Sequence, residues 1–413
     1  MCCVGFVEKR EKSYNKIDIL VFFTKEKVYS NLVWRNTNKN EEDVYNMKTQ
    51  TKDKKDIFFN NRMDMKLLYM VILLTAFGIL FLTEFYSWKM DSFYFSRRQI
   101  FMAIIGVFMA LVISRMNYRT FLKMDYVVVP MMIICMVVFP TTIRRTVNEL
   151  WFSIGEIFSI QYSELMELLA CMVLADAVSE KRRNMCGTRF LVRYGVLIAL
   201  LALFGSARSV LIISCIAVIV LFIKKPQFII WFIAVVWFGL FVVLFINHNL
   251  PLRVQVWQDP FGMYDRGGVE IVQSIYAIAS GGFFGVGIED TKLMNCTRNM
   301  NYAYITSGIF RKIGWIGIAG FLVVYAYFFW RAIRITTRMN ERRGFYMAAV
   351  ITIRYMVLFG INLLVAVNLL PPTNVRMPFV SYSGTGLIFD FFLLGILLSI
   401  SRKRPQTVWR QES

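Results

Sequence analysis

The chain has 413 residues, of which 57% are hydrophobic and 18% are charged, whereas soluble domains carry roughly 25% charged residues. Together with recurring apolar runs of about 20 residues, this composition excludes an ordinary soluble enzyme and predicts an integral membrane protein with the lipid bilayer as partner. The net charge of +20 does not indicate a nucleic-acid partner, because Lys and Arg gather in alternate short connections between the apolar runs.

The amino-terminal part differs in composition from the rest, being rich in Lys, Asn, Asp and Glu. Its two short apolar runs, 17–23 and 28–34, are too short to cross about 30 Å of hydrocarbon. We therefore interpret residues 1–64 as a polar cytoplasmic extension, 65–404 as the membrane domain and 405–413 as a short cytoplasmic tail.

Apolar runs long enough to cross a bilayer predict about ten transmembrane helices. A backbone in hydrocarbon must satisfy its own hydrogen bonds, so the expected fold class is all-α. The distribution of Lys and Arg places both termini in the cytoplasm. The predicted spans are, in chain order, 65–83, 99–114, 124–141, 164–179, 190–205, 209–223, 228–247, 313–331, 345–369 and 379–400.

The longest predicted extracytoplasmic connection runs over about 248–312, between the seventh and eighth spans. Its apolar stretch 271–279 predicts a short interfacial helix. Glycines between 281 and 287 then allow the backbone to turn sharply. Loops of this length are typically functional or partly re-entrant, so we expect binding residues here.

A distinctive motif precedes and opens the last span. Asn362 is followed over 370–385 by Leu-Pro-Pro-Thr-Asn-Val-Arg-Met-Pro-Phe-Val-Ser-Tyr-Ser-Gly-Thr. This run resembles the signature of the SEDS family (FtsW, RodA, SpoVE), in which an Asn precedes Leu-Pro-x-Thr-Gly, Leu-Pro-Phe and Ser-Tyr-Gly-Gly-Ser. The residues shared at identical spacing are Leu370, Pro371, Thr373, Pro378, Phe379, Ser381, Tyr382 and Gly384.

Three further blocks resemble the family in the same order along the chain. The pair Arg98-Gln99 opens the second span, and segments 151–155 and 161–164 lead into the fourth. The large loop contributes Asp259-Pro-Phe-Gly, Gln273-Ser274 and the glycine-rich run.

The resemblance implies a divergent SEDS-type fold in the bacterial cytoplasmic (inner) membrane, with about ten transmembrane helices and a role in peptidoglycan synthesis. Division, cell shape and sporulation are the processes that such proteins serve. SEDS proteins resemble inverting glycosyltransferases that polymerise a lipid-linked disaccharide-pentapeptide (lipid II), usually beside a transpeptidase, the class B penicillin-binding protein. This chemistry needs a base for the acceptor hydroxyl and cations for the pyrophosphate leaving group.

The candidate substrate-binding residues are polar positions within these blocks and their surroundings. No cofactor motif is present, and no spacing of Cys or His indicates a metal site. A divalent cation beside the pyrophosphate is compatible with the expected chemistry. The substrate-binding candidates are Arg98, Gln99, Gln161, Ser163, Arg208, Gln273, Ser274, Ser381 and Tyr382.

The sequence departs from the family at several polar positions. The catalytic Asp expected from the resemblance aligns with Ala303, and an expected Lys aligns with Glu167. An expected Arg is Leu150, an expected Asp is Ser206, and Arg208 stands where Gly is usual. We hypothesise that Glu167 and Arg208 form a charge-reversed pair in the central cavity.

Three functions are compatible with these matches and departures. The first is an active glycosyltransferase whose base has moved to Glu164, Glu167 or Glu270. The second is a catalytically silent SEDS relative that binds precursor or a transpeptidase and regulates wall synthesis. The third is a transporter of the lipid-linked precursor, because intramembrane polar residues also mark transport sites. The departures favour the second function over the first, and no inverted repeat supports the third.

Overall fold

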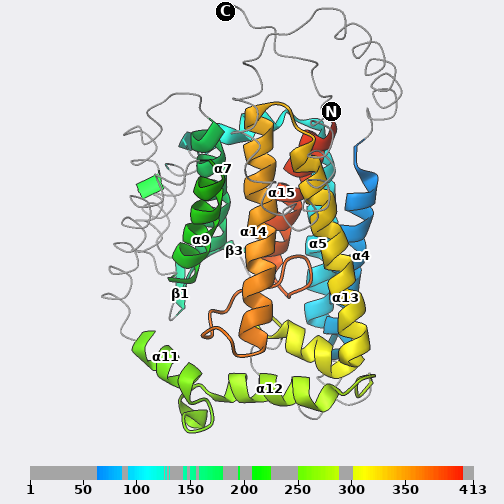
Figure 1. Ribbon diagram of the computed structural model, residues 1–413, viewed down its shortest axis with the longest axis vertical. Coiled ribbons are helices and arrows are strands. Elements are labelled where there is room, and N and C mark those ends of the chain that lie inside the picture. The colour runs from blue at the N-terminus through cyan, green and yellow to red at the C-terminus, as the bar shows by residue number, and fades with distance from the viewer. Residues whose placement is uncertain are drawn as a thin grey trace, which may run out of the picture.

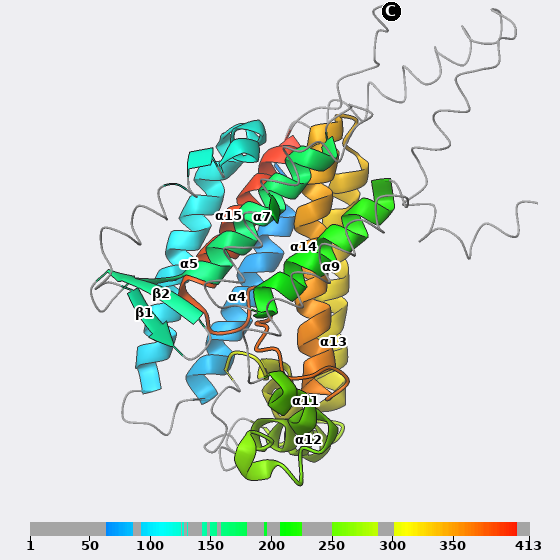
Figure 2. The ribbon, with the colours of Figure 1, turned by 90° about the vertical axis from the view of Figure 1, so that its left-hand side faces the viewer.

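The structure is a computed structural model, and its long helices run side by side along the longest axis (Figure 1). Two shorter helices lie across one end of this bundle, as Figure 2 also shows. The described residues are 63–85, 92–124, 126, 127, 130, 143–146, 149–154, 158–179, 194, 195, 207–224, 250–287 and 301–402.

The long helices are α4 (Met65–Phe85), α5 (Ser92–Arg115), α7 (Tyr162–Ser179), α9 (Ala207–Lys224), α13 (Ile305–Thr337), α14 (Arg342–Ala366) and α15 (Gly384–Arg402). The shorter elements are η2 (Tyr118–Lys123), α11 (Leu250–Gln258), η5 (Tyr264–Arg266) and α12 (Val269–Gly281). The short helix predicted at 271–279 is confirmed as α12, which crosses the end of the bundle (Figure 1). Its place at the membrane interface stays a prediction.

Five of the described helices are long and apolar enough to cross a membrane: α4, α5, α13, α14 and α15. The apolar part of α9, Arg208–Ile223, is shorter. Since hydrocarbon offers no hydrogen bonds to a backbone, such helices are the structure expected of an integral membrane protein. Predicted spans 124–141, 190–205 and 228–247 fall mostly outside the described residues, so the count of ten stays a prediction.

Helix α15 lies inside the bundle and crosses α5 closely. A Cβ on Gly106 would lie 2.5 Å from Phe391, and one on Gly395 would lie 2.9 Å from the Ala110 carbonyl oxygen. Glycine at these two positions therefore permits the close approach, as small residues do between membrane helices. This contact holds the middle of α15 against the second half of α5.

The described residues also form a small antiparallel sheet before α7, which the all-α prediction did not include. Thr146 is the Cα partner of Glu149, so only a two-residue connection separates the first two strands. Two-residue connections are the commonest hairpin loops, and the aromatic and β-branched residues of this segment favour strands. The strands are β1 (Ile143–Thr146), β2 (Glu149–Ile154) and β3 (Phe158–Gln161).

Helix α13 begins eight residues before the predicted span at 313, and it bends at Gly314, where φ is +65°. The glycine-rich segment after α12 pairs with this bend, because Trp315 N donates to Gly282 O and Val286 N donates to Arg311 O. A Cβ on Gly314 would lie 2.3 Å from Gly285 N, so only glycine fits there. The bend thereby attaches the end of α12 to the start of α13.

Candidate functional site

The candidate site is the short segment 301–304, which directly precedes α13 and contains Ala303. Side chain and backbone groups of the carboxyl-terminal motif hold this segment from two directions. Asn362 Nδ2 donates to Ala303 O at 2.9 Å, and Ser381 Oγ donates to Tyr302 O at 2.8 Å. Tyr382 N donates to Asn301 O at 2.9 Å. We call these three contacting residues, with 301–304, the motif clamp.

Asn362 also fixes the motif loop that connects α14 to α15. Its Nδ2 donates to Val375 O at 2.7 Å, and its Oδ1 accepts from Thr306 Oγ1 at 2.6 Å. The side chain is fully buried, so its amide satisfies two carbonyl groups that water does not reach. This residue type suits the position because an amide carries both donors and an acceptor.

Arg208 connects the clamp to α7 and α9. Its Nη1 donates to the Tyr302 hydroxyl at 3.0 Å and to Asn374 O at 2.8 Å. Its Nη2 lies 3.4 Å from Ser163 Oγ. The guanidinium fork therefore joins three separate segments, a geometry that the compact Lys ammonium would not reproduce.

Gln99 connects the same region to α5. Its Nε2 donates to Ser381 O and its Oε1 accepts from Ser383 N, both at 3.3 Å. Its neighbour Arg98 is half-buried, and Arg98 Nη2 lies 4.0 Å from the point where a Cβ on Gly384 would be. The predicted Arg98-Gln99 block thus contacts the carboxyl-terminal motif directly.

Two predicted site residues, Ser274 and Gln273, lie on α12 and differ in their hydrogen bonds. Ser274 Oγ lies 2.5 Å from Ser307 Oγ and donates to Ala366 O at 2.7 Å, so it ties α12 to α13 and α14. Gln273 is buried beside it, and its Oε1 makes no hydrogen bond with the described residues. The same holds for Gln161 Nε2, whereas the Gln161 backbone N lies 3.5 Å from Thr385 Oγ1. These two amides therefore keep hydrogen-bonding capacity that the described residues do not use.

A buried ion network lies next to the clamp. Arg376, in the motif loop, donates to Glu164 Oε1 at 2.8 Å and to Asp390 Oδ1 at 3.0 Å. Arg354 on α14 donates to the same Asp390 oxygen at 3.0 Å and lies 3.6 Å from Glu167. All five side chains are at most 5% exposed. The network joins α7, α14, α15 and the motif loop.

The charges of this network nearly balance. Two guanidinium groups face three carboxylates, and Arg208 brings a third cation close by, since its neighbour Ser209 donates to Glu167 Oε1 at 2.6 Å. Buried ions persist only when paired and hydrogen-bonded, because each is costly to remove from water. Glu164 and Glu167 are therefore held in ion pairs, which makes neither of them suited to act as a general base.

Glu270 is the remaining predicted base. It lies in the first turn of α12 and is half-buried. Burial raises the pKa of the Tyr304 hydroxyl, the charge of Glu270 raises it further and the charge of Arg253 lowers it, so both charges lie near Tyr304. Tyr304 adjoins Ala303, whose side chain is fully buried and carries no ionisable group.

The structure places a cation beside Glu167 that the sequence analysis did not name. Arg354 lies 3.6 Å from Glu167, whereas the bonds of the Arg208 guanidinium run to Tyr302, Asn374 and Ser163. Glu167 and Arg208 remain in one polar region through Ser209. Their direct pairing stays a prediction.

Three central residues were missed by sequence reasoning: Arg354, Arg376 and Asp390. A usable signal existed, because Arg354 and Asp390 are opposite charges inside two consecutive apolar spans, where ionisable groups are rare and paired. Arg376 lay within the recognised motif, but it is not one of the residues that the motif shares with the family signature. Of the lost family residues, Leu150 lies in β2 and Ser206 falls outside the described residues.

No group of three or more His, Cys, Asp or Glu side chains within the described ranges is arranged to hold a metal ion. The cations of the site are instead guanidinium groups, which bind phosphate oxygens through several charge-assisted bonds at once. Of these groups, the Arg208 guanidinium contacts segment 301–304 directly, through the Tyr302 hydroxyl. Position 303 offers no carboxylate.

Comparison with known proteins gives a consistent result. A family model described as "Cell cycle protein" (FTSW_RODA_SPOVE) matches residues 64–406. Stage V sporulation protein E of Bacillus subtilis is 28% identical over 331 residues, covering 76% of this chain and 88% of the relative. A probable peptidoglycan glycosyltransferase FtsW of Trichlorobacter lovleyi is 28% identical over 362 residues, covering 82% and 93%.

Solved structures show the same fold. A chain of a peptidoglycan synthase complex that coordinates polymerisation and crosslinking has a TM-score of 0.67 at 19% identity, covering 83% of this chain and 98% of that one. The rod shape determining protein RodA of Thermus thermophilus has a TM-score of 0.59 at 19% identity, covering 84% and 98%.

Proposed function

Because this chain belongs to the FtsW, RodA and SpoVE family of cell cycle proteins, we propose that it acts in peptidoglycan synthesis by binding lipid-linked disaccharide-pentapeptide, lipid II. The observation that carries this proposal is the motif clamp, in which Asn362, Ser381 and Tyr382 converge on segment 301–304. Arg208 adds a cation that would face a pyrophosphate group bound there.

We propose that binding, rather than sugar transfer, is the contribution of this site. A glycosyltransferase needs a base at the acceptor hydroxyl, and position 303 provides a methyl group. Glu164 and Glu167 are held by Arg376 and Arg354. The protein would then regulate wall synthesis by presenting precursor or by engaging its partner.

A second candidate, polymerisation with Glu270 as base, is favoured by one observation. Glu270 is half-buried in the first turn of α12, and its charge raises the pKa of the Tyr304 hydroxyl next to Ala303. A carboxylate need only reach the acceptor hydroxyl within hydrogen-bond distance of a bound substrate to serve as base.

The partner and the topology are part of the same proposal. One structural relative comes from a peptidoglycan synthase complex, which supports a class B penicillin-binding protein as the partner here. We place about ten helices in the bacterial inner membrane, with both termini and residues 1–64 and 405–413 in the cytoplasm. The connection 248–312 then faces outward, where lipid II would be used.

The test uses purified full-length protein and fluorescent lipid II, with and without a candidate transpeptidase. The expected result is saturable precursor binding without polymer. Polymer from the unmodified protein that is lost in Glu270→Gln would establish the second candidate instead. A chain that neither binds precursor nor alters polymerisation by a partner complex would contradict both. Adding EDTA to the same assay tests for a divalent cation.

A further inference from the structure

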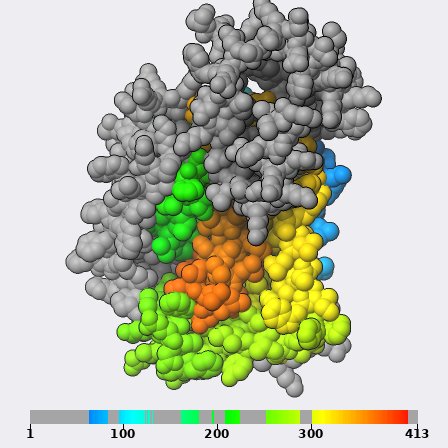
Figure 3. All heavy atoms as spheres, in the orientation of Figure 1, coloured from blue at the N-terminus to red at the C-terminus, as the bar shows by residue number. Residues whose placement is uncertain are grey.

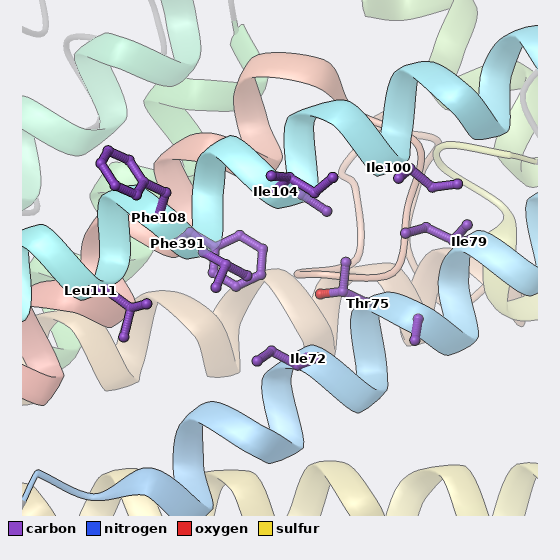
Figure 4. Close-up of a pocket in the computed structure, with 11 residues that line it drawn as sticks. Ile72, Thr75, Ile79, Ile100, Ile104, Phe108, Leu111 and Phe391 are labelled. Carbon is purple, nitrogen blue, oxygen red and sulfur yellow. The ribbon is translucent and has the colours of Figure 1, made fainter.

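An apolar groove lies on the lipid-facing side of the bundle between α4 and α5, with a cavity volume of about 460 Å³ (Figure 4). Phe391 of α15 forms its floor, and Gly106 permits this because a Cβ there would meet the ring at 2.5 Å. The α4 wall consists of Ile72, Thr75, Ala76 and Ile79. The α5 wall consists of Ile100, Ala103, Ile104, Val107, Phe108 and Leu111.

The α5 wall is one stripe of a helix, since its members recur every three or four residues. From Ile100 to Leu111 it rises roughly 16 Å, about half the thickness of the hydrocarbon core. Ile104 and Phe108 are 64% and 68% exposed, so the groove is open to the bilayer along this length. Its dimensions suit a single extended hydrocarbon chain.

One end of the groove is polar and adjoins the candidate site. Thr83 Oγ1 donates to Ser96 Oγ at 3.0 Å and joins the two walls just beyond Ile79 and Ile100. Arg97 precedes Ile100 by three residues, so it lies on the same stripe one turn earlier, and it is exposed. Arg98 and Gln99 come next and contact the start of the motif helix α15 and the motif loop.

We propose that this groove binds the polyprenyl chain of a lipid-linked phosphate, with the phosphate at Arg97 and Arg98. The inference rests on the proposed function and names the part of the precursor that the groove holds. Guanidinium groups at the mouth complement a phosphate, and the apolar stripe complements the chain. A chain seated here leads from the bilayer to Gln99 and thus to the motif clamp.

The first experiment labels full-length protein in phosphatidylethanolamine nanodiscs with a long-chain polyprenyl phosphate that carries a diazirine on its chain. We expect the label on α4 and α5 peptides, and an excess of phosphatidylglycerol should leave it unchanged. Ala103→Phe should lower labelling at least about tenfold by filling the groove. The control Ala326→Phe, on an exposed part of α13, should not.

Three results would overturn the inference. Equal competition by phosphatidylglycerol would make the groove a site for ordinary membrane lipid. Unchanged labelling of Ala103→Phe would place the chain elsewhere. If Ala103→Phe does not elute as a single species, Ala76→Phe replaces it, because this variant fills the groove from the other wall. A loss of labelling in Arg115→Gln but not in Arg97→Gln would put the phosphate at the opposite end.

Failure of the groove and failure of the proposed function are separable. If unmodified protein binds lipid II and Ala103→Phe binds it with the same affinity, the groove inference is wrong while the proposed function stands. If unmodified protein takes the polyprenyl phosphate label in the groove but shows no binding of lipid II, the proposed function is wrong.

Discussion

The Asn362 amide nitrogen lies 2.9 Å from the Ala303 carbonyl oxygen, so a motif residue of α14 holds the position at which the family resemblance placed a catalytic carboxylate. The contact runs to the backbone and is independent of the side chain at 303. The scaffold of the site can therefore persist after its carboxylate is lost. Holding segment 301–304 in place and supplying a catalytic side chain are therefore separate properties of this site.

Replacing Asn362 with Leu should destabilise the fold. The variant leaves the buried carbonyl groups of Ala303 and Val375 without their donor, which we expect to cost about 1–3 kcal/mol for each group. Thermal unfolding in detergent should show a lower midpoint, together with weaker precursor binding. Leu364→Ala, at a half-exposed position of the same helix, is the control and should leave both nearly unchanged.

The ion network predicts a clear double-mutant cycle. Arg354→Met should destabilise by about 3–5 kcal/mol, because it leaves the charge of Glu167 buried without its guanidinium neighbour and leaves Asp390 with Arg376 alone. Combining it with Glu167→Met should recover the part of the loss that comes from the unpaired Glu167 charge. A double variant as unstable as the single one would show that the two side chains do not interact.

The same cycle decides the hypothesis on Arg208. If Glu167 interacts mainly with Arg354, the coupling energy between Glu167→Gln and Arg354→Gln will exceed that between Glu167→Gln and Arg208→Gln. The opposite ranking would restore the predicted charge-reversed pair. Charge reversal offers an independent check, because Glu167→Arg combined with Arg208→Glu regains folded yield only if the two groups face each other.

The bend of α13 can be tested with two glycines of one helix. Gly314→Ala should destabilise the attachment of the segment after α12, because φ is +65° and the added Cβ would lie 2.3 Å from Gly285 N. Gly320→Ala meets nothing within 4 Å and should stabilise the helix slightly, by up to about 1 kcal/mol. Limited proteolysis should cut the 281–287 segment faster in the first variant alone. Equal cleavage in both would contradict the role assigned to the bend.

The helices were predictable because a backbone in lipid must satisfy its own hydrogen bonds, and long apolar runs do so as helices. Seven predicted spans coincide with described helices, and five of these helices are long and apolar enough to cross a membrane. The boundaries were less predictable. Helix α13 begins in a segment that carries Arg311 and Lys312, both of which are buried. Because these residues are charged, hydropathy places the start of the span after them. The sheet was missed because short strands beside apolar spans give little periodic signal.

The candidate site was predictable in its members but not in its connections. Comparison with the family pattern identified Gln99, Arg208 and Ser381 as candidates, and in the structure all three lie at or next to the motif clamp. It gave no indication that Arg376 bridges Glu164 and Asp390, because that pairing depends on three segments far apart in sequence. Long-range pairing of charges is set by helix packing, which a single sequence does not specify.

Two buried amides should distinguish binding from folding. Gln161 Nε2 and Gln273 Oε1 make no hydrogen bonds with the described residues, so replacing either residue with Leu removes no bond from the protein. Removing a buried polar group that has no partner is nearly neutral or stabilising. We therefore expect Gln161→Leu and Gln273→Leu to keep or raise the unfolding midpoint.

If these amides bind the precursor, the same variants should lower affinity for fluorescent lipid II by about tenfold, the usual effect of one lost polar contact of about 1.4 kcal/mol. Gln99→Leu is the matched control, because Gln99 bonds Ser381 and Ser383 and its loss should lower the unfolding midpoint as well. Precursor affinity that stays unchanged in both amide variants would remove Gln161 and Gln273 from the binding site. Reduced affinity at full stability would instead identify them as ligand contacts that flank the motif clamp.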